Sequence, residues 1–337
     1  MKKISTWNDL VSKYGDIEIE LIKNIIKEIE NNPYKKNWYQ DFIKKKYGID
    51  KKQLDIIQEF FKDYDIDLSN DDEIYKYYSQ AKTLGLISFI PVDKNAYNLL
   101  FEKTMNELNK KIVAQTTKEV FEIVKRVELE VNLKIVPYDV SLRNAYKELG
   151  KKGITCVTYE RKDGSEVNYS IEPYVRREMM TSVAQFNKER SLKILEDMDA
   201  EEVITSQHIG ARNKGIGYRN HESWQGKVFH RSEFEEKTGL GEVDGLCGIN
   251  CRHTFFAYLG QKLMPPIEDK GEYDLTQKQR YLERQVRKSK REFASATTDE
   301  EKMIARKKIS KAQKNVRDFI KEHHFLKRDY LREKIVI

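Results

Sequence analysis

Apolar residues recur at helical spacing through most of the first 150 residues. The stretch IEIELIKNIIKEIENN, residues 17–32, places its isoleucine and leucine side chains on one broad face, and Asn31, Asn32 and Pro33 end the pattern. Residues 94–131 show the same period without Gly or Pro, which predicts a pair of longer helices. We therefore expect residues 1–150 to form a helical N-terminal region.

The pattern changes near Lys151, where apolar and polar residues begin to alternate. ITCVTYERKDGSEVNYSI, residues 154–171, alternates on both sides of Asp163-Gly164, a dipeptide typical of a tight β-hairpin turn. A helical stretch with Pro173 near its first turn follows, and EEVITSQHI, residues 201–209, predicts a short strand. Residues 151–264 are thus expected to form a small α+β core whose Gly-, His- and Cys-rich loops begin near residue 208.

After Pro265-Pro266 the helical period returns. Two highly charged stretches, residues 277–294 and 300–335, are separated by SATTDEE, in which Thr298 or Asp299 can cap the second helix. An antiparallel helical hairpin over residues 265–337 is the simplest arrangement. The predicted fold class is α+β and predominantly helical, with three parts along the chain.

Charge is distributed unevenly between these parts. The chain has 62 Lys plus Arg against 55 Asp plus Glu, a net charge of +7. Residues 276–334 hold 19 basic and 9 acidic residues, a local balance of +10, so the rest of the chain sums to −3. The basic tail could contact a polyanion such as packaged double-stranded DNA. The alternative is a solvated helical face of mixed charge. Candidate DNA contacts are Lys278, Arg284, Arg287, Lys288, Lys290 and Arg291.

Neither a secretory signal nor a membrane span is predicted. The charged N-terminus is not followed by an apolar block, and no apolar run approaches the roughly 18 residues that cross a bilayer. The most apolar run, residues 84–92, is expected to be a buried segment. The cysteines are Cys156, Cys247 and Cys251, an odd number that favours reduced thiols or a metal over a disulfide framework. We expect a soluble chain that is synthesised in a cytoplasm.

Residues 206–258 differ from the rest of the chain in composition. They read SQHIGARNKGIGYRNHESWQGKVFHRSEFEEKTGLGEVDGLCGINCRHTFFAY, with a high density of Gly, His, Cys, Arg and aromatic residues. Glycine permits positive φ angles and close approach of backbone segments. The pattern therefore predicts irregular but specified loops, and Trp224-Gln225-Gly226 is expected to anchor them in the core.

The order SxHxGAR, NHxSWQGKVF and GLCGxNCRHxFF resembles the phage minor capsid protein 2 family, portal-adjacent head proteins similar in organisation to the Mu-type head morphogenesis proteins. YVRREMMTSVAQ, QKQRYLERQVRKSKRE and the final RDYLRE resemble helices of the same family, so the resemblance covers about residues 174–332, whereas the first 150 match it only in being helical. The motif residues are His208, Gly210, Arg212, His221, Trp224, Gln225, Gly226, Gly245, Cys247, Gly248, Asn250, Cys251, Arg252 and His253.

This resemblance implies a structural component of a tailed-bacteriophage virion. Members of such a family are expected in few copies, at the portal or the inner capsid surface, where they serve head assembly or DNA packaging and delivery. The implied partners are the portal, other capsid proteins and packaged DNA. The implied location is the phage head, after synthesis in the bacterial host cytoplasm.

The same motif residues could also carry chemistry. Cys247, Cys251 and His253, completed by His221, His208 or His230, are chemically sensible zinc ligands. A thiol nucleophile would use Cys251 or Cys247 with His221 or His253 as base. A nuclease, or another virion-carried enzyme such as a transferase, would use His208, Arg212, His221 and Lys227 as acid, base and phosphate clamp. We favour a structural cluster without cofactor or catalysis, with zinc and the enzyme left as alternatives.

Overall fold

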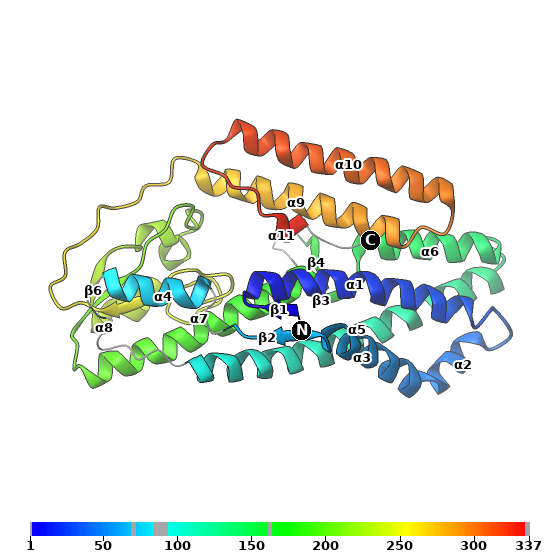
Figure 1. Ribbon diagram of the computed structural model, residues 1–337, viewed down its shortest axis with the longest axis horizontal. Helices are drawn as coiled ribbons and strands as arrows, with labels where there is room; N and C mark the ends of the chain where they lie inside the picture. The colour runs from blue at the N-terminus through cyan, green and yellow to red at the C-terminus, as the bar shows by residue number, and fades with distance from the viewer. Residues whose placement is uncertain (1, 69–71, 84–85, 87–93, 161–163, 334–337) are drawn as a thin grey trace.

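The computed structural model describes residues 2–68, 72–83, 86, 94–160 and 164–333 as an elongated, predominantly helical α+β molecule (Figure 1). This confirms the predicted fold class. The helices before residue 153 are α1 (Trp7–Glu30), α2 (Trp38–Lys44), α3 (Lys46–Phe61), α4 (Asp72–Thr83), α5 (Lys94–Asn132) and α6 (Tyr138–Lys152). Two short parallel strands, β1 (Lys2–Ile4) and β2 (Tyr64–Ile66), pair beside α1.

Helix α1 lies at the centre of the molecule. It begins after Thr6, whose side-chain oxygen accepts a hydrogen bond from the Asp9 backbone N–H at 3.0 Å, and it ends at Glu30, as the sequence predicts. Residues 94–131 were expected to form two helices but belong to the single helix α5, of 39 residues. The absence of Gly and Pro from this stretch explains why the helix continues.

The largest hydrophobic core runs through both the N-terminal region and the following segment. It includes residues from Ile4 to Phe256 and joins α1 and α5 to α7 (Ile171–Asp197). A second, smaller core contains Val203, Trp224 and Phe255. The boundary drawn at residue 150 therefore separates two sequence patterns but does not separate two hydrophobic cores. Of the predicted buried segment 84–92, only Leu86 lies within the described residues, and it is buried.

Two antiparallel sheets form after residue 153. Strands β3 (Thr155–Glu160) and β4 (Glu166–Ser170) make the predicted hairpin, although Asp163 lies outside the described residues. Helix α7 begins directly after β4. The second sheet has the order β6-β5-β7. Its strands are β5 (Glu202–Thr205), β6 (Val228–His230) and β7 (Phe255–Ala257), and α8 (Arg231–Thr238) follows β6.

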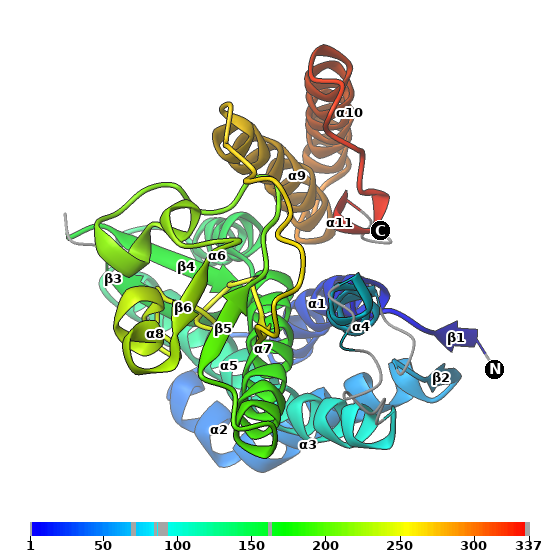
Figure 2. The same cartoon turned by 90° about the vertical axis from the view of Figure 1, so that its left-hand side faces the viewer.

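The last helices form the predicted antiparallel hairpin. Helices α9 (Glu272–Ala294) and α10 (Asp299–Glu322) pack through Val286 and Val316, and the Thr298 side chain caps α10 by accepting a hydrogen bond from the Glu301 N–H at 3.2 Å. Helix α11 (Tyr330–Glu333) folds back onto α9. Both views place α10 at the outer edge of the molecule beside α9 (Figures 1 and 2). Within the described residues no helix is long and apolar enough to cross a membrane.

Buried ion pairs attach α9 to the body. Arg287 contacts Glu172 of α7 at 3.1 Å, and Arg291, one turn later, contacts Glu18 of α1 at 3.5 Å. The carboxylate of Glu18 also accepts a hydrogen bond from the Ile154 backbone N–H at 3.1 Å. Burial raises the pKa of Glu18 despite Arg291, whereas Arg287 and Arg176 outweigh burial and hold the pKa of Glu172 below its usual value.

Replacing Glu172→Ala should lower the free energy of unfolding by about 3–5 kcal/mol, because it leaves Arg287 buried without its carboxylate. Asp318→Ala is the control, because it breaks the exposed pair between Lys314 and Asp318 and should cost less than about 1 kcal/mol. Urea unfolding of both variants measures the difference. Equal losses in the two variants would show that the buried pair does not hold α9.

Candidate functional site

Two irregular loops meet at one end of the three-stranded sheet. Residues 206–227 connect β5 to β6, and residues 239–254 connect α8 to β7. Both β6 and β7 run antiparallel to β5, so both loops lie where β5 ends and its two neighbours begin. A hydrogen bond from the Ser206 N–H to the Thr254 carbonyl, at 2.8 Å, joins the loops at this end. Residues far apart in the sequence are thereby brought together.

Glycine allows the backbone of the second loop to fold tightly on itself. A Cβ atom at Gly245 would lie 1.9 Å from the Gly239 carbonyl oxygen, a separation that real Cβ atoms do not reach. Next to Gly245, the Leu246 N–H donates to the Thr238 carbonyl at 3.0 Å. The close approach explains why the GLCG motif carries glycine at this position.

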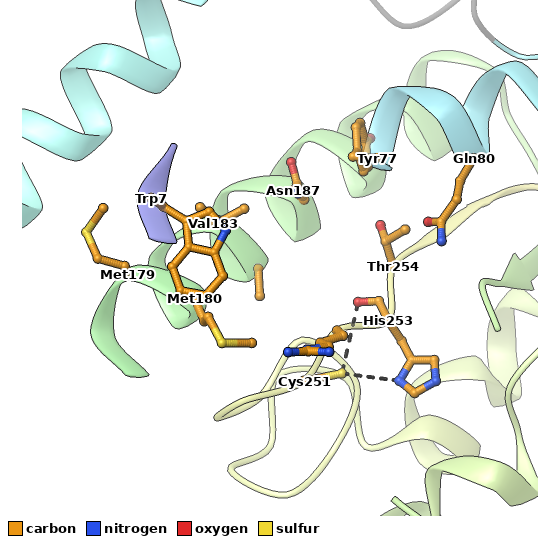
Figure 3. A pocket seen from close by; sticks show the side chains of 12 residues that line it. Trp7, Tyr77, Gln80, Met179, Met180, Val183, Asn187, Cys251, His253 and Thr254 are labelled. Atoms are coloured by element: carbon orange, nitrogen blue, oxygen red, sulfur yellow. Dashed lines mark hydrogen bonds between the residues drawn. The ribbon is translucent and has the colours of Figure 1, made fainter. Parts of the chain in front are cut away.

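Three side chains of types that can bind a metal converge in the space between the loops. His221 comes from the first loop and Cys251 and His253 from the second, and all three are buried. The Cys251 Sγ atom lies 3.9 Å from Nδ1 of His221 and 3.7 Å from Nδ1 of His253. Figure 3 shows the thiol of Cys251 facing the ring of His253. The three ligand atoms all lie within 4.8 Å of one another.

The outer nitrogen of each histidine ring faces an oxygen. Nε2 of His221 lies 2.9 Å from the Asp244 carbonyl oxygen, and Nε2 of His253 lies 3.1 Å from Oε1 of Gln225. Burial lowers the pKa of His221 to about 4, so this ring is neutral at neutral pH. The Asp244 carbonyl can only accept a hydrogen bond, so Nε2 of His221 carries the hydrogen that points to it, and Nδ1 is the nitrogen that faces Cys251.

Aromatic packing holds the cluster in place. Trp224 is 2% exposed, and its ring centroid lies 4.7 Å from those of both His221 and His253. The indole N–H donates to the Tyr218 carbonyl at 2.8 Å. On the other side, the ring of His208 stacks on His253 at 4.3 Å. Trp224 thus lies in the core position predicted for it and contacts both histidines that face Cys251.

Cys247 lies outside this group of ligands. It is buried in the smaller hydrophobic core with Leu246, and its backbone has a φ of 58°. Burial raises the pKa of its thiol well above the usual value. The structure therefore brings together three of the four predicted zinc ligands. Of the two predicted nucleophiles, burial disfavours Cys247, because the thiolate is the reactive form.

A cationic cleft of about 530 Å³ opens beside the histidines. Its walls are the start of α7, the two loops and one face of α9, and His208, His221 and His253 all line it. It contains seven arginines and two glutamates, Glu172 and Glu283. The arginines are Arg176, Arg212, Arg252, Arg280, Arg284, Arg287 and Arg332. The formal balance of these nine side chains, seven positive and two negative, is +5.

Ion pairs neutralise only part of this charge. Glu172 serves both Arg176 and Arg287, and Glu283 lies 3.7 Å from Arg332. Burial, together with the neighbouring Arg252 and Arg332, lowers the pKa of Arg280 to about 9. The cleft therefore keeps a positive potential that favours anions.

The residues of the predicted nuclease do not form one catalytic arrangement. His208, Arg212 and His221 line the cleft, but the amine of Lys227 donates to the Ser223 carbonyl at 2.6 Å. Arg212 is paired with Asp244 at 2.9 Å. His221 has its two ring nitrogens directed at a carbonyl oxygen and a thiol. Lys227 is therefore not part of the cleft lining, and both ring nitrogens of His221 are engaged within the protein.

The six predicted DNA contacts divide by burial. Lys278 and Arg284 are exposed and Lys288 is half-buried, whereas Arg287, Lys290 and Arg291 are 7–8% exposed. The amine of Lys290 donates to the Glu333 carbonyl at 2.9 Å, and the two arginines make the ion pairs of α9. The charged groups of these three residues are engaged within the protein, which disfavours them as DNA contacts.

The cleft also includes Arg176, Arg280 and Arg332, which were not predicted as site residues. Arg280 and Arg284 stand four residues apart, a spacing that places both on one face of a helix. That spacing can be read from the sequence, but the sequence does not show that α7 packs opposite this face of α9 and forms the other wall of the cleft.

The model of the family described as phage minor capsid protein 2 matches residues 2–321. The chain belongs to this family. The match begins at residue 2, so it corrects the expectation that the first 150 residues share only helicity with the family. It confirms the resemblance inferred from the loop motifs, and it makes this chain a structural protein of the phage particle.

Two curated phage proteins are similar to this chain. A protein named "Structural protein" of Lactococcus phage mv4 is 36% identical over 106 residues, which are 29% of this chain and 86% of that protein. Another "Structural protein", from Lactococcus phage LL-H, is 29% identical over 185 residues, which are 49% of this chain and 48% of that protein. The match thus spans about half of the second relative. No solved structure matches the chain significantly.

Gly245→Ala should destabilise the protein by at least about 2 kcal/mol, because the new Cβ would overlap the Gly239 backbone. Gly48→Ala is the matched control. A Cβ at this position in α3 would have no neighbour within 4 Å, so this change should stabilise the protein by up to about 1 kcal/mol. Thermal and urea unfolding measure both effects. A neutral Gly245→Ala variant would contradict the tight turn.

Proposed function

We propose that this minor capsid protein lies at the inner surface of the phage head, near the portal, and contacts packaged double-stranded DNA through the outer face of α10. Family membership supports a role in the capsid. The portal and the assembly or delivery role are inferred from the resemblance of the loop motifs to portal-adjacent head proteins. The DNA contact is argued from the arrangement of charge on α10.

Five cations lie along the solvent side of α10. Lys307, Lys311, Lys314, Arg317 and Lys321 are all exposed. At 3.6 residues per turn they fall within an arc of about 120° of the helix. The residues that α10 buries are Ala305, Ile309, Ala312 and Val316, which project from the opposite side. Asp318 lies within the same arc and pairs with Lys314 at 2.8 Å, so the five cations and one carboxylate form a stripe of net charge +4 opposite the apolar contact with α9.

The spacing of this stripe suits a polyanion. A helix rises 1.5 Å per residue, so the 14 residues between Lys307 and Lys321 span about 21 Å. Both views of the fold place α10 at the outer edge of the molecule (Figures 1 and 2). Exposed lysines and arginines contact the phosphates of DNA whatever its base sequence. A protein that contacts packaged DNA needs this kind of sequence-independent binding.

The enzyme alternative has weaker support from the same geometry. The histidines of the cleft are engaged with one another, with carbonyl and amide oxygens and with a thiol, and Lys227 lies outside the cleft. A DNA cleavage assay with the purified protein and Mg²⁺ distinguishes the two functions. Cleavage that disappears in a folded His208→Ala or Arg212→Ala variant would favour the enzyme over the structural role.

A variant with Lys307→Gln, Lys311→Gln, Arg317→Gln and Lys321→Gln should bind a short duplex DNA more weakly than the wild type. The slope of the logarithm of the binding constant against the logarithm of the salt concentration should become less negative by up to about 3 to 4. The reason is that about 0.9 counterions are released for each phosphate neutralised. Binding is measured by fluorescence anisotropy at several salt concentrations.

The control carries Lys36→Gln, Lys51→Gln, Lys125→Gln and Lys151→Gln. It removes the same charge from four exposed lysines of the N-terminal helices and of their neighbouring loops. Its salt dependence should stay close to that of the wild type. If both variants lose affinity equally, net charge and not the α10 stripe determines binding. A cryo-electron microscopy map of the particle tests the position near the portal.

A further inference from the structure

The cluster of His221, Cys251 and His253 has the composition and geometry of a transition-metal site. The distances from Cys251 Sγ to the two Nδ1 atoms are 3.9 and 3.7 Å. In a tetrahedral zinc site, with Zn–S of about 2.3 Å and Zn–N of about 2.0–2.1 Å, sulfur and nitrogen ligands lie about 3.6 Å apart. The sulfur therefore lies near the expected ligand separation from both nitrogens, and all three atoms lie within 4.8 Å of one another.

The two histidine rings are oriented as metal ligands commonly are. Oε1 of Gln225 accepts a hydrogen bond from the His208 backbone N–H at 3.0 Å, which identifies this atom as the amide oxygen. Nε2 of His253 must then donate to it, just as Nε2 of His221 donates to the Asp244 carbonyl. Both rings thus keep the lone pair of Nδ1 for the space beside Cys251. A hydrogen bond from the outer ring nitrogen to an oxygen acceptor commonly sets the tautomer and the ring orientation of a metal-bound histidine.

A cation satisfies this arrangement better than a proton does. A thiol carries one hydrogen and can donate it to one ring at a time, whereas the lone pairs of both rings are directed at the same sulfur. A metal ion accepts electron pairs from the thiolate and from both imidazoles at once. One thiolate with two imidazoles selects zinc-like ions over Mg²⁺ and Ca²⁺, which prefer oxygen ligands.

We propose that His221, Cys251 and His253 bind one zinc ion, with Gln225 and the Asp244 carbonyl as positioning groups. Cys247 is not a ligand, in contrast to the set suggested by the sequence spacing. His221 and His253 also line the cationic cleft, so the fourth coordination position faces water or an anion held there. The site joins the two loops at the end of the sheet and is independent of the DNA contact proposed for α10.

Purified full-length protein is stripped with a chelator in reducing buffer and titrated with Co²⁺, a spectroscopic substitute for Zn²⁺. The wild type should bind one Co²⁺ per chain, with the near-ultraviolet thiolate-to-cobalt band and the visible bands of a tetrahedral site. Zn²⁺ should displace it stoichiometrically. If the wild type binds neither ion stoichiometrically, or binds Co²⁺ without the thiolate band, the proposal is wrong.

Cys251→Ala and Cys247→Ala form a matched pair, because both remove a buried thiol from the same loop. The thiolate band should disappear in Cys251→Ala and remain in Cys247→Ala, and the reverse result would overturn the ligand assignment. Gln225→Ala should keep the band but weaken Co²⁺ binding by about 10- to 100-fold, the usual effect of removing a group that orients a ligand. Unchanged affinity would remove Gln225 from the site.

A measurement on the wild type alone covers the case in which Cys251→Ala does not fold. Zinc-edge X-ray absorption of the zinc-loaded protein should show one sulfur neighbour together with imidazole nitrogens. A first shell with no sulfur, or with two sulfurs, would exclude the proposed ligand set.

Discussion

The position of α9 depends on two carboxylates buried beneath it. Glu172 and Glu18 come from α7 and α1, and they meet Arg287 and Arg291 on one face of α9. Removing charges from water costs several kcal/mol per ion, so such pairs are retained only where their geometry is well defined. A slide of α9 by one residue would direct both guanidinium groups away from their partners. The pairs therefore specify the register of α9 as well as its attachment.

That register fixes two other features of the molecule. The same helix supplies Arg280, Arg284 and Arg287 to the wall of the cationic cleft. It also carries α10 on its outer side, so the cationic stripe of α10 faces away from the body. The cleft and the stripe are consequently placed by the same buried contacts, although they lie on different sides of α9.

Features that depend on neighbouring residues could be predicted from the sequence. The Thr298 cap, the Pro173 position in the first turn of α7 and the β3–β4 hairpin all follow from local backbone preferences. The burial of Arg287 and Arg291 could not, because their partners lie far away in the sequence. In the sequence of a highly charged helix, a buried arginine cannot be distinguished from an exposed one. The prediction of DNA contacts from composition therefore included Arg287 and Arg291.

The candidate site shows the same limit on a smaller scale. The motif residues indicated which side chains gather, but sequence spacing could not separate Cys247 from Cys251. Both Cys247 and Asn250 adopt a φ of 58°, and both thiols are buried in the smaller core, but only that of Cys251 faces the two histidines. The direction of a side chain in an irregular loop depends on such backbone angles. Residue type and spacing do not encode them directly.

The basic tail therefore consists of two populations of cations with different physical properties. Arg287 and Arg291 are buried with their carboxylates, where salt screens them little. The stripe from Lys307 to Lys321 is in solvent, where attraction to phosphates weakens as salt rises. Ionic strength can consequently change contacts with a polyanion while α9 stays attached to the body. Without Glu18 of α1 and Glu172 of α7, a tail of the same net charge would not contain these two populations. Its arginines would have no buried carboxylate to hold α9 against the body.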